Sequence, residues 1–165
     1  NDPKNFAPLY KKYYEPIFQF VYQRIDDQDT AKDITSQVFL NVLCNLKKYE
    51  YKGLPFSSWI YRIAYNEALG FIKRSAKNRC VNIDSAGIYK IMDDIETDHK
   101  EEYCAYIIKV ISQLPEEELQ MVEMRFFEKR AFKEIGEILG ITENNAKVKL
   151  YRILDKLRTL ITIKK

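Results

Sequence analysis

The sequence is poor in the residues from which catalytic and metal sites are usually built. Its 165 residues include one histidine, His99, and three separated cysteines, Cys44, Cys80 and Cys104, with no CxxC pair. A glycine-rich phosphate loop, an HExxH motif and EF-hand spacing of carboxylates are all absent from it. Scattered cysteines in odd number argue against a disulfide framework or a zinc site and fit a reducing compartment. We therefore expect no enzyme activity, no cofactor and no metal, and a location in the cytoplasm.

Long apolar runs are also absent. No stretch reaches the roughly 18 consecutive apolar residues that a membrane-spanning helix needs. The first residues, NDPKNFAPLYKKYY, lack the apolar core of a signal peptide. We expect no membrane insertion. The chain begins with Asn1 and not with Met, so whether an N-terminal extension was removed stays open.

Glycine is scarce, with five residues, and no alternating strand-like pattern persists. Apolar residues recur instead at three- and four-residue spacing, which predicts an all-α fold. We expect two small helical domains, over residues 1–75 and 105–165. Between them, residues 76–104 lose the periodicity and gather acidic residues. This composition predicts an acidic, flexible linker, in part helical at most.

The stretch from Phe132 to Leu157 predicts two helices joined by a tight turn. Gly140 stands where a helix end favours a left-handed residue, and Thr142 can cap the next helix. The second helix should bury the apolar residues Ala146, Leu150, Ile153, Leu154 and Leu157. Its other face carries amides and cations: Asn144, Asn145, Lys147, Lys149, Tyr151 and Arg152. This arrangement is typical of a helix-turn-helix whose second helix enters the major groove of DNA.

Charge supports the same interpretation. The net charge is only +3, but residues 129–165 contain ten Lys or Arg against four Asp or Glu. A concentration of basic charge on one segment is what phosphate binding requires. Two antiparallel helices with a solvated Lys/Arg face also occur in ordinary helical bundles, and the pattern alone does not exclude that alternative.

A second nucleic-acid signal lies in residues 55–74, PFSSWIYRIAYNEALGFIKR, where aromatic residues alternate with cations. Flat rings stack on unpaired bases and cations bind the backbone, which suits single-stranded or melted DNA. At helical spacing many of these rings can instead belong to the hydrophobic core. We expect Trp59 to serve the packing of this core at least as much as DNA binding. We expect Tyr49, Tyr51 and Tyr65 to be more exposed. The candidate set is Tyr49, Trp59, Arg62, Tyr65, Asn66, Lys73 and Arg74.

Three segments in this order resemble bacterial extracytoplasmic-function (ECF) sigma factors. They are DTAKDITSQVFLNVLCNL, then PFSSWIYRIAYNEALGFIKR, then LPEEELQMVEMRFFEKRAFKEIGEILGITENNAKVKLYRILDKLR. The resemblance covers nearly the whole chain except the linker. It implies a promoter-recognition subunit of bacterial RNA polymerase. The first domain would recognise the −10 element and the second, like region 4 of the family, the −35 element.

Carried over by position, the resemblance implies three contact surfaces. The second helix would bind the β′ clamp helices of core RNA polymerase through Asp33, Gln37 and Asn41. The loop over residues 47–56 would capture a flipped −10 base, with the aromatic and cationic candidates above along the melted strand. The helix with Thr142 at its start would lie in the −35 major groove. Expected partners are core RNA polymerase, including its β flap, promoter DNA and an anti-sigma factor.

The sequence departs from the family pattern at a few positions. Ser36 and Gln37 stand where the family often has a glutamine–acid pair, and Gly70 stands where an aspartate is common. Lys149 replaces a frequent arginine. A lysine is a point charge without the forked geometry that recognises guanine, so we expect Lys149 to contact phosphate.

Two other functions remain as alternatives. A helix-turn-helix regulator would bind an operator without polymerase, and a helical adaptor would bind only protein. Substitution of Lys147, Lys149 and Arg152 by alanine distinguishes the adaptor from the two DNA-binding functions.

Overall fold

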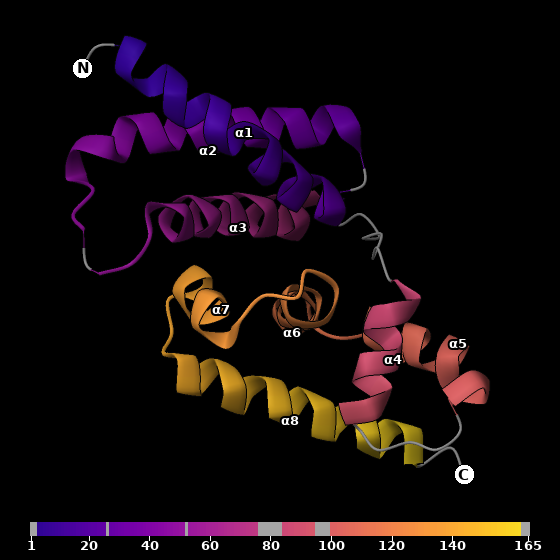
Figure 1. Cartoon of the computed structure of the whole chain (residues 1–165). Helices are drawn as coiled ribbons and strands as arrows, with labels where there is room; N and C mark the ends of the chain where they lie inside the picture. Colours follow the sequence, from indigo (N-terminus) through magenta and orange to yellow (C-terminus); the bar gives the residue numbers. More distant parts are fainter. Residues whose placement is uncertain (1–2, 26, 52, 76–83, 95–99, 163–165) are drawn as a thin grey trace. The chain divides into compact units, whose positions relative to one another are not determined.

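The computed structural model describes residues 3–25, 27–51, 53–75, 84–94 and 100–162. Within these ranges the chain forms helices and no strand, which confirms the predicted all-α class (Figure 1). The helices are α1 (Pro3–Ile25), α2 (Gln28–Asn45), α3 (Phe56–Ser75), α4 (Ser85–Asp94), α5 (Lys100–Ser112), α6 (Glu116–Val122), α7 (Phe132–Leu139) and α8 (Glu143–Thr162). A 3₁₀ turn, Leu46–Lys48, follows α2, and a π-helical turn, Glu123–Phe127, follows α6.

The contacts divide the chain into two compact units. The first consists of Asn1–Asn82 with Glu137–Leu139, and the second of Ile83–Gly136 with Gly140–Lys165. Two helical units agree with the predicted organisation. The exact boundaries at residues 75 and 105 stay a prediction.

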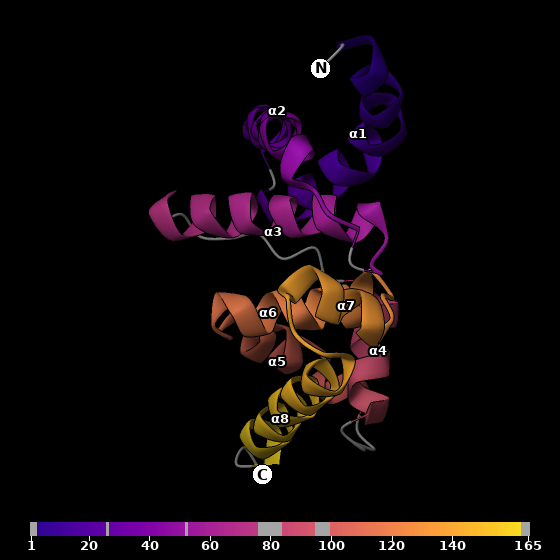
Figure 2. The same cartoon turned by 90° about the vertical axis from the view of Figure 1, so that its left-hand side faces the viewer.

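In the first unit, α1, α2 and α3 pack against one another (Figure 2). The side chain of Asp27 caps α2 by accepting a hydrogen bond of 2.8 Å from the backbone N–H of Thr30. The core of this unit is apolar and consists of Ile17, Phe20, Val21, Ile34, Val38, Phe39, Val42, Ile60, Ala64 and Ala68.

One charged side chain is buried in this core. Arg24 is 1% exposed, and its guanidinium lies 3.6 Å from the ring centre of Phe20 and donates a hydrogen bond of 2.7 Å to the carbonyl oxygen of Phe20. Stacking and hydrogen bonding both lower the cost of burying the charge.

In the second unit, α4, α5, α6 and α8 pack around a core that includes Ile107, Ile111, Leu119 and Val122. Helix α6 begins after Pro115 with three glutamates in its first turn. Proline suits a helix start because it has no backbone N–H that would need an acceptor there. The negative carboxylates of the first turn face the positive end of the helix dipole.

The predicted linker, residues 76–104, contains the helix α4. Helix α4 buries Ile88, Ile91 and Met92 against the second unit, and α4 contacts both α5 and the π-helical turn. Gly87 permits this packing, because a Cβ there would lie 2.1 Å from Cδ1 of Phe127. The apolar residues of α4 span little more than one helical turn, a signal too short to separate a helix from a linker by periodicity. Residues 100–104 of the predicted linker form the start of α5, and residues 76–83 and 95–99 lie outside the described residues.

Candidate nucleic-acid interface

The helix-turn-helix is built from α7, a tight turn and α8. Gly140 ends α7 in the left-handed conformation, with φ of 72°, as predicted. The turn is closed by a hydrogen bond of 2.9 Å from the Ile141 N–H to the Gly136 carbonyl oxygen. Thr142 caps α8, since its hydroxyl accepts a bond of 3.2 Å from the Asn145 N–H. The predicted turn and cap are both confirmed.

Glycine is also required inside α7. A Cβ on Gly136 would lie 2.8 Å from the Ile141 carbonyl oxygen and 3.3 Å from the backbone nitrogen of Glu143. These are backbone atoms of the turn and of the start of α8, so a side chain at residue 136 would push α8 away from α7.

Helix α8 buries the predicted apolar face and exposes the predicted polar one. Ala146 is 0% exposed and Leu150 is 1% exposed. The residues buried on α8 are Ala146, Leu150, Ile153, Leu154, Leu157 and Ile161. Those exposed on the opposite side of its first turns are Asn144, Asn145, Val148, Lys149, Tyr151 and Arg152.

The cations of α8 differ in their surroundings. Lys147 forms an ion pair of 3.0 Å with Glu143, and its ammonium lies 5.8 Å from the ring centre of Phe132. Lys156 forms an ion pair of 2.9 Å with Glu118 of α6.

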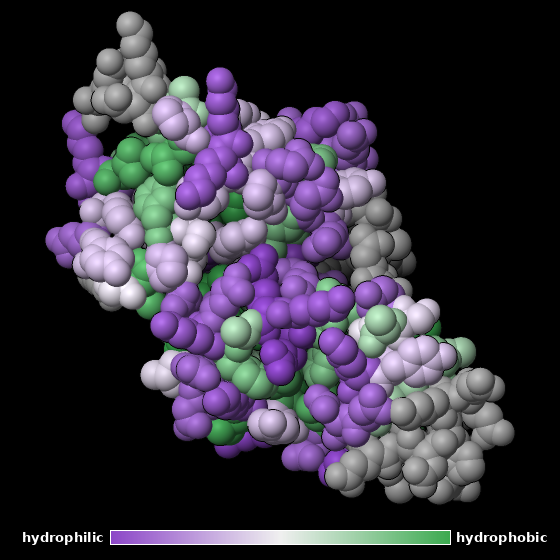
Figure 3. Space-filling view, in the orientation of Figure 1, coloured by the Kyte–Doolittle hydropathy of each residue, from purple (hydrophilic) through white to green (hydrophobic). Residues whose placement is uncertain are grey.

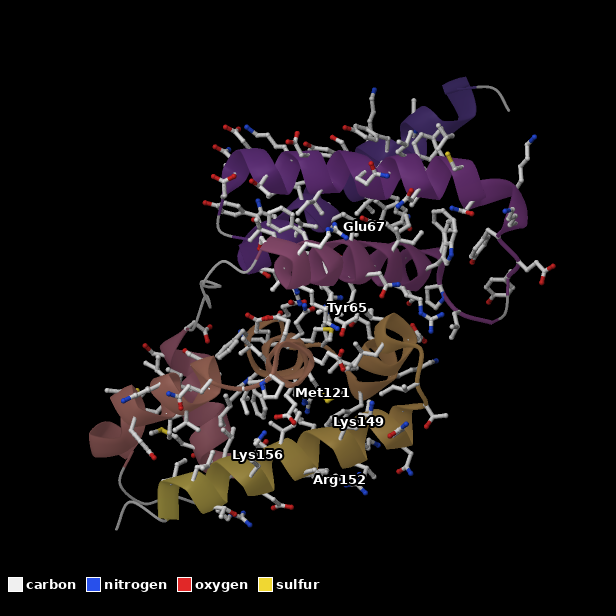
Figure 4. The ribbon with its side chains drawn as sticks, turned by 180° about the vertical axis from the view of Figure 1, so that it is seen from behind. Tyr65, Glu67, Met121, Lys149, Arg152 and Lys156 are labelled. Carbon is white, nitrogen blue, oxygen red and sulfur yellow. The ribbon has the colours of Figure 1, made fainter. Side chains whose placement is uncertain are left out.

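Lys149 and Arg152, by contrast, form no ion pair within the described part of the chain. Figure 4 shows these two residues and Lys156 along α8. Among the predicted cations, Lys149 and Arg152 can therefore meet phosphate without breaking an ion pair seen in the structure.

Two residues near this surface are missing from the sequence-based set. Val148 is 39% exposed between the predicted DNA contacts of α8. Arg125 places its guanidinium 4.5 Å from the ring centre of Phe132 and donates a hydrogen bond of 3.0 Å to the Arg130 carbonyl oxygen. Helical spacing could have found Val148, because it stands two residues from both Ala146 and Leu150. No pattern in the sequence identifies the partners of Arg125.

In the first unit, three aromatic rings gather at the start of α3. The ring centres of Tyr49 and Trp59 are 4.9 Å apart, and Phe56 lies 5.1 Å from Tyr49 and 5.4 Å from Trp59. Trp59 is half-buried, as expected, and Arg62 lies beside it. Tyr51 is 75% exposed, which confirms its predicted exposure.

Tyr65 does not behave as predicted. It is only 8% exposed, because it falls on the face of α3 that also buries Ala64 and Ala68. The prediction that Tyr65 is well exposed is therefore wrong. Its neighbour Asn66 is exposed, as are Lys73 and Arg74 near the end of α3. A role for Tyr65 at the melted strand stays a prediction, and only the small exposed part of its side chain would be able to contact DNA.

The three predicted polymerase contacts lie on α2. Asp33 is exposed. The amide of Gln37 donates a bond of 3.2 Å to the side-chain oxygen of Asn41, whose own amide donates a bond of 2.7 Å to Glu67 of α3. Glu67, labelled in Figure 4, was not among the residues predicted from the sequence, and its hydrogen bond fixes the orientation of Asn41.

Apolar side chains reach the surface of the same helix. Leu40 is 53% exposed and Leu43 is 48% exposed. Figure 3 shows hydrophobic residues gathered on the surface over the C-terminal half of α2. Exposed apolar residues beside oriented polar ones are typical of a protein-binding surface.

The described residues contain no group of three His, Cys, Asp or Glu side chains placed to hold a metal ion. None of their helices combines the length and the apolar character needed to cross a membrane.

Two family models match the chain in sequence order. Sigma-70 region 2 matches residues 9–78, and sigma-70 region 4 matches residues 110–159. The first match contains the aromatic cluster and the polar chain of α2. The second contains α7, the turn and α8 as far as residue 159.

Relatives with similar sequences carry corresponding names. The ECF RNA polymerase sigma factor BldN of Streptomyces coelicolor is 24% identical over 160 residues, which are 94% of this chain and 60% of BldN. The chain therefore spans less than two thirds of the length of BldN. RNA polymerase sigma factor SigZ of Bacillus subtilis is 26% identical over 158 residues, covering 95% of this chain and 87% of SigZ. ECF RNA polymerase sigma factor SigW of the same organism is 25% identical over 167 residues, covering 95% of this chain and 89% of SigW.

A chain in the solved RsbN–BldN complex is 22% identical, with a TM-score of 0.40, over 96% of this chain and 93% of that one. The two family models together match more than half of the residues, in the order that the sequence predicted. The chain belongs to the sigma-70 family of RNA polymerase sigma factors, in its extracytoplasmic-function group.

Proposed function

We propose that the protein binds core RNA polymerase and directs promoter recognition and transcription initiation through contacts to −10 and −35 DNA. The observation that carries this proposal is the presence of both sigma-70 regions, 2 and 4, in one chain. A helix-turn-helix regulator acting alone would not need the region 2 unit.

For the −35 element, we propose that α8 enters the major groove. The proposed contact residues are Thr142, Asn144, Asn145, Lys147, Lys149, Tyr151 and Arg152. Asn144 is exposed and can pair with the edge of adenine, which presents one acceptor and one donor there. Lys149 and Arg152 supply the charge for phosphate. Lys147 would bind phosphate only if its ion pair with Glu143 breaks, or if its ammonium binds Glu143 and the phosphate at the same time.

For the −10 element, we propose that the cluster of Tyr49, Phe56 and Trp59 receives unpaired bases. Stacking of a base on an aromatic ring is worth about 1–3 kcal/mol and requires no particular base. Arg62 lies beside Trp59, and Asn66, Lys73 and Arg74 follow along α3, where they would track the backbone of the melted strand.

For polymerase, we propose that α2 is the docking helix. Asp33, Gln37 and Asn41 supply hydrogen-bonding groups, and Leu40 and Leu43 supply apolar area. The bond from Asn41 to Glu67 fixes one of these groups before binding, which lowers the entropy cost of the complex. The same exposed residues are where an anti-sigma factor, a further proposed partner, would compete.

The protein would supply no catalytic group itself. Nucleotide chemistry would belong to the core enzyme, and the place of action would be the cytoplasm, where promoter DNA and polymerase meet. Its own contribution would be selection of the start site.

The physical reason for two DNA surfaces is the weakness of each. A small helical module holds DNA without specificity at about 10⁻⁴–10⁻⁶ M. Each good base contact adds about 1–3 kcal/mol. Fixing both units on one polymerase makes the second contact intramolecular and raises its effective concentration.

The test is transcription from a template library. Purified protein and bacterial core polymerase are added to templates whose upstream 45 base pairs, roughly, are randomised, and the transcribed templates are sequenced. We expect two enriched blocks at −35 and −10. Transcription that is not enriched in any sequence, or that does not depend on the added protein, would contradict the proposal.

A further inference from the structure

We propose that Val148, with Tyr151 beside it, reads a thymine in the −35 element through the C5 methyl group. The inference rests on the proposed function, and it names the base chemistry that α8 selects. None of the positions carried over from the family includes Val148.

The position of Val148 on α8 excludes a role in the core. Residues two apart on a helix lie on nearly opposite sides, and Val148 is two residues from Ala146 and two from Leu150. These two neighbours are 0% and 1% exposed, whereas Val148 is 39% exposed. The valine therefore points away from the core and occupies the middle of the exposed face.

Helix formation does not explain the valine either. A β-branched residue loses side-chain freedom in a helix, so an exposed helical position favours alanine, lysine or glutamate over valine. At this position the apolar side chain lowers helix stability slightly and leaves hydrophobic surface in water.

Tyr151 extends the apolar surface. It follows Val148 by three residues and is therefore its neighbour on the helix, and it is 58% exposed. Lys149 and Arg152 stand next to this pair and form no ion pair within the described residues. An apolar strip with free cations beside it matches the major groove, whose floor is made of base edges and whose rims are phosphate.

Only one group on those base edges is apolar. Each base pair presents hydrogen-bond donors and acceptors in the major groove, and thymine adds a C5 methyl group. A valine in the middle of the reading face can bury this methyl, and it has no hydrogen bond to offer to guanine, cytosine or adenine. The geometry therefore favours a thymine opposite Val148 over any other base.

The experiment removes the methyl group and nothing else. The promoter obtained from the template library is synthesised with each −35 thymine replaced in turn by deoxyuridine, and equilibrium binding of the reconstituted holoenzyme is measured. Loss of one buried methyl-sized group corresponds to about 0.8 kcal/mol, which is about a fourfold loss of affinity. We expect such a loss at one −35 thymine and no loss at thymines of the spacer.

The variant Val148→Ser removes both methyl groups of the side chain, and serine has a helix propensity close to that of valine. It should bind the thymine and deoxyuridine promoters equally, within about 1.5-fold, because the apolar contact is gone. Val148→Ile keeps an apolar side chain and should retain sensitivity to deoxyuridine. Far-ultraviolet circular dichroism confirms that both variants remain helical.

The outcomes separate the two proposals. Promoter-selective transcription with no deoxyuridine effect, with the same effect in Val148→Ser, or with a −35 block that contains no thymine overturns this inference alone. A protein that directs no selective transcription overturns the proposed function, and this inference falls with it.

Discussion

The carbonyl oxygen of Ile141 lies so close to Gly136 that a Cβ on residue 136 would be only 2.8 Å from it. The same two residues are joined by the hydrogen bond from the Ile141 N–H to the Gly136 carbonyl. The turn that aims α8 therefore depends on the absence of a side chain inside α7.

Substitution Gly136→Val should open this turn. The added side chain meets backbone atoms, which cannot rotate away, and overpacking of this kind costs about 1–3 kcal/mol. We expect a loss of stability in that range in urea unfolding, together with weaker binding of duplex −35 DNA.

Gly70→Ala is the matched control on α3. A Cβ there would meet only the guanidinium of Arg74, at 3.2 Å, at the end of a flexible and exposed side chain. Alanine stabilises a helix interior by about 0.5–1 kcal/mol relative to glycine. A stability loss at Gly70 equal to that at Gly136 would contradict the steric argument.

Substitution Gly87→Ala should release α4 from the second unit. The new Cβ would fall 2.1 Å from the ring of Phe127, so helix and ring cannot keep their present separation. We expect the backbone amides of α4 to exchange with solvent at least tenfold faster in hydrogen-exchange mass spectrometry. The exposed neighbour Ala86 offers the control Ala86→Ser, which should leave exchange nearly unchanged. Unchanged protection in Gly87→Ala would mean that α4 does not pack as described.

Tyr65→Ala should affect stability as well as any DNA contact. Removing a large buried ring costs about 3–5 kcal/mol, and Tyr65 is 8% exposed. Asn66→Ala, next to it on the exposed side, should change stability by less than about 0.5 kcal/mol. Thermal unfolding of the two variants separates the packing role of Tyr65 from a role in binding. Equal and small effects would show that Tyr65 is not part of the core.

Lys149→Ala and Arg152→Ala should each weaken DNA binding and lower its salt dependence. Each phosphate contact contributes about 0.9 to the slope of log affinity against log salt, so each variant should reduce the slope by about 1 if its cation meets phosphate. Lys90→Ala removes an exposed positive charge from α4 of the same unit and should leave the slope unchanged. A similar decrease in all three variants would indicate a general charge effect and no defined contact.

The helix-turn-helix could be predicted from sequence because its signals are local. Gly140 and Thr142 determine the turn through backbone conformation and a hydrogen bond within four residues. The spacing of the apolar residues on α8 then determines which face is buried. These are interactions between near neighbours in the chain, and a sequence displays them directly.

Other features depend on residues far apart in the chain. The bond between Asn41 and Glu67 joins positions 26 residues apart, and the packing of Gly87 on Phe127 joins α4 to the π-helical turn. No periodicity reports such pairs. The error at Tyr65 has a different origin, since aromatic residues beside cations suit both DNA binding and a core, and only the packing of α3 decided between them.

The central claim is that two weak DNA surfaces become selective only on polymerase. The most direct measurement compares binding of the library-derived promoter and of a scrambled duplex, at one salt concentration, by the free protein and by the holoenzyme. We expect the free protein to bind both duplexes alike, at about 10⁻⁴–10⁻⁶ M. The holoenzyme should prefer the promoter by at least about 10³-fold, the lower end for specific protein–DNA complexes. A free protein that selects the promoter as strongly as the holoenzyme does would contradict the account.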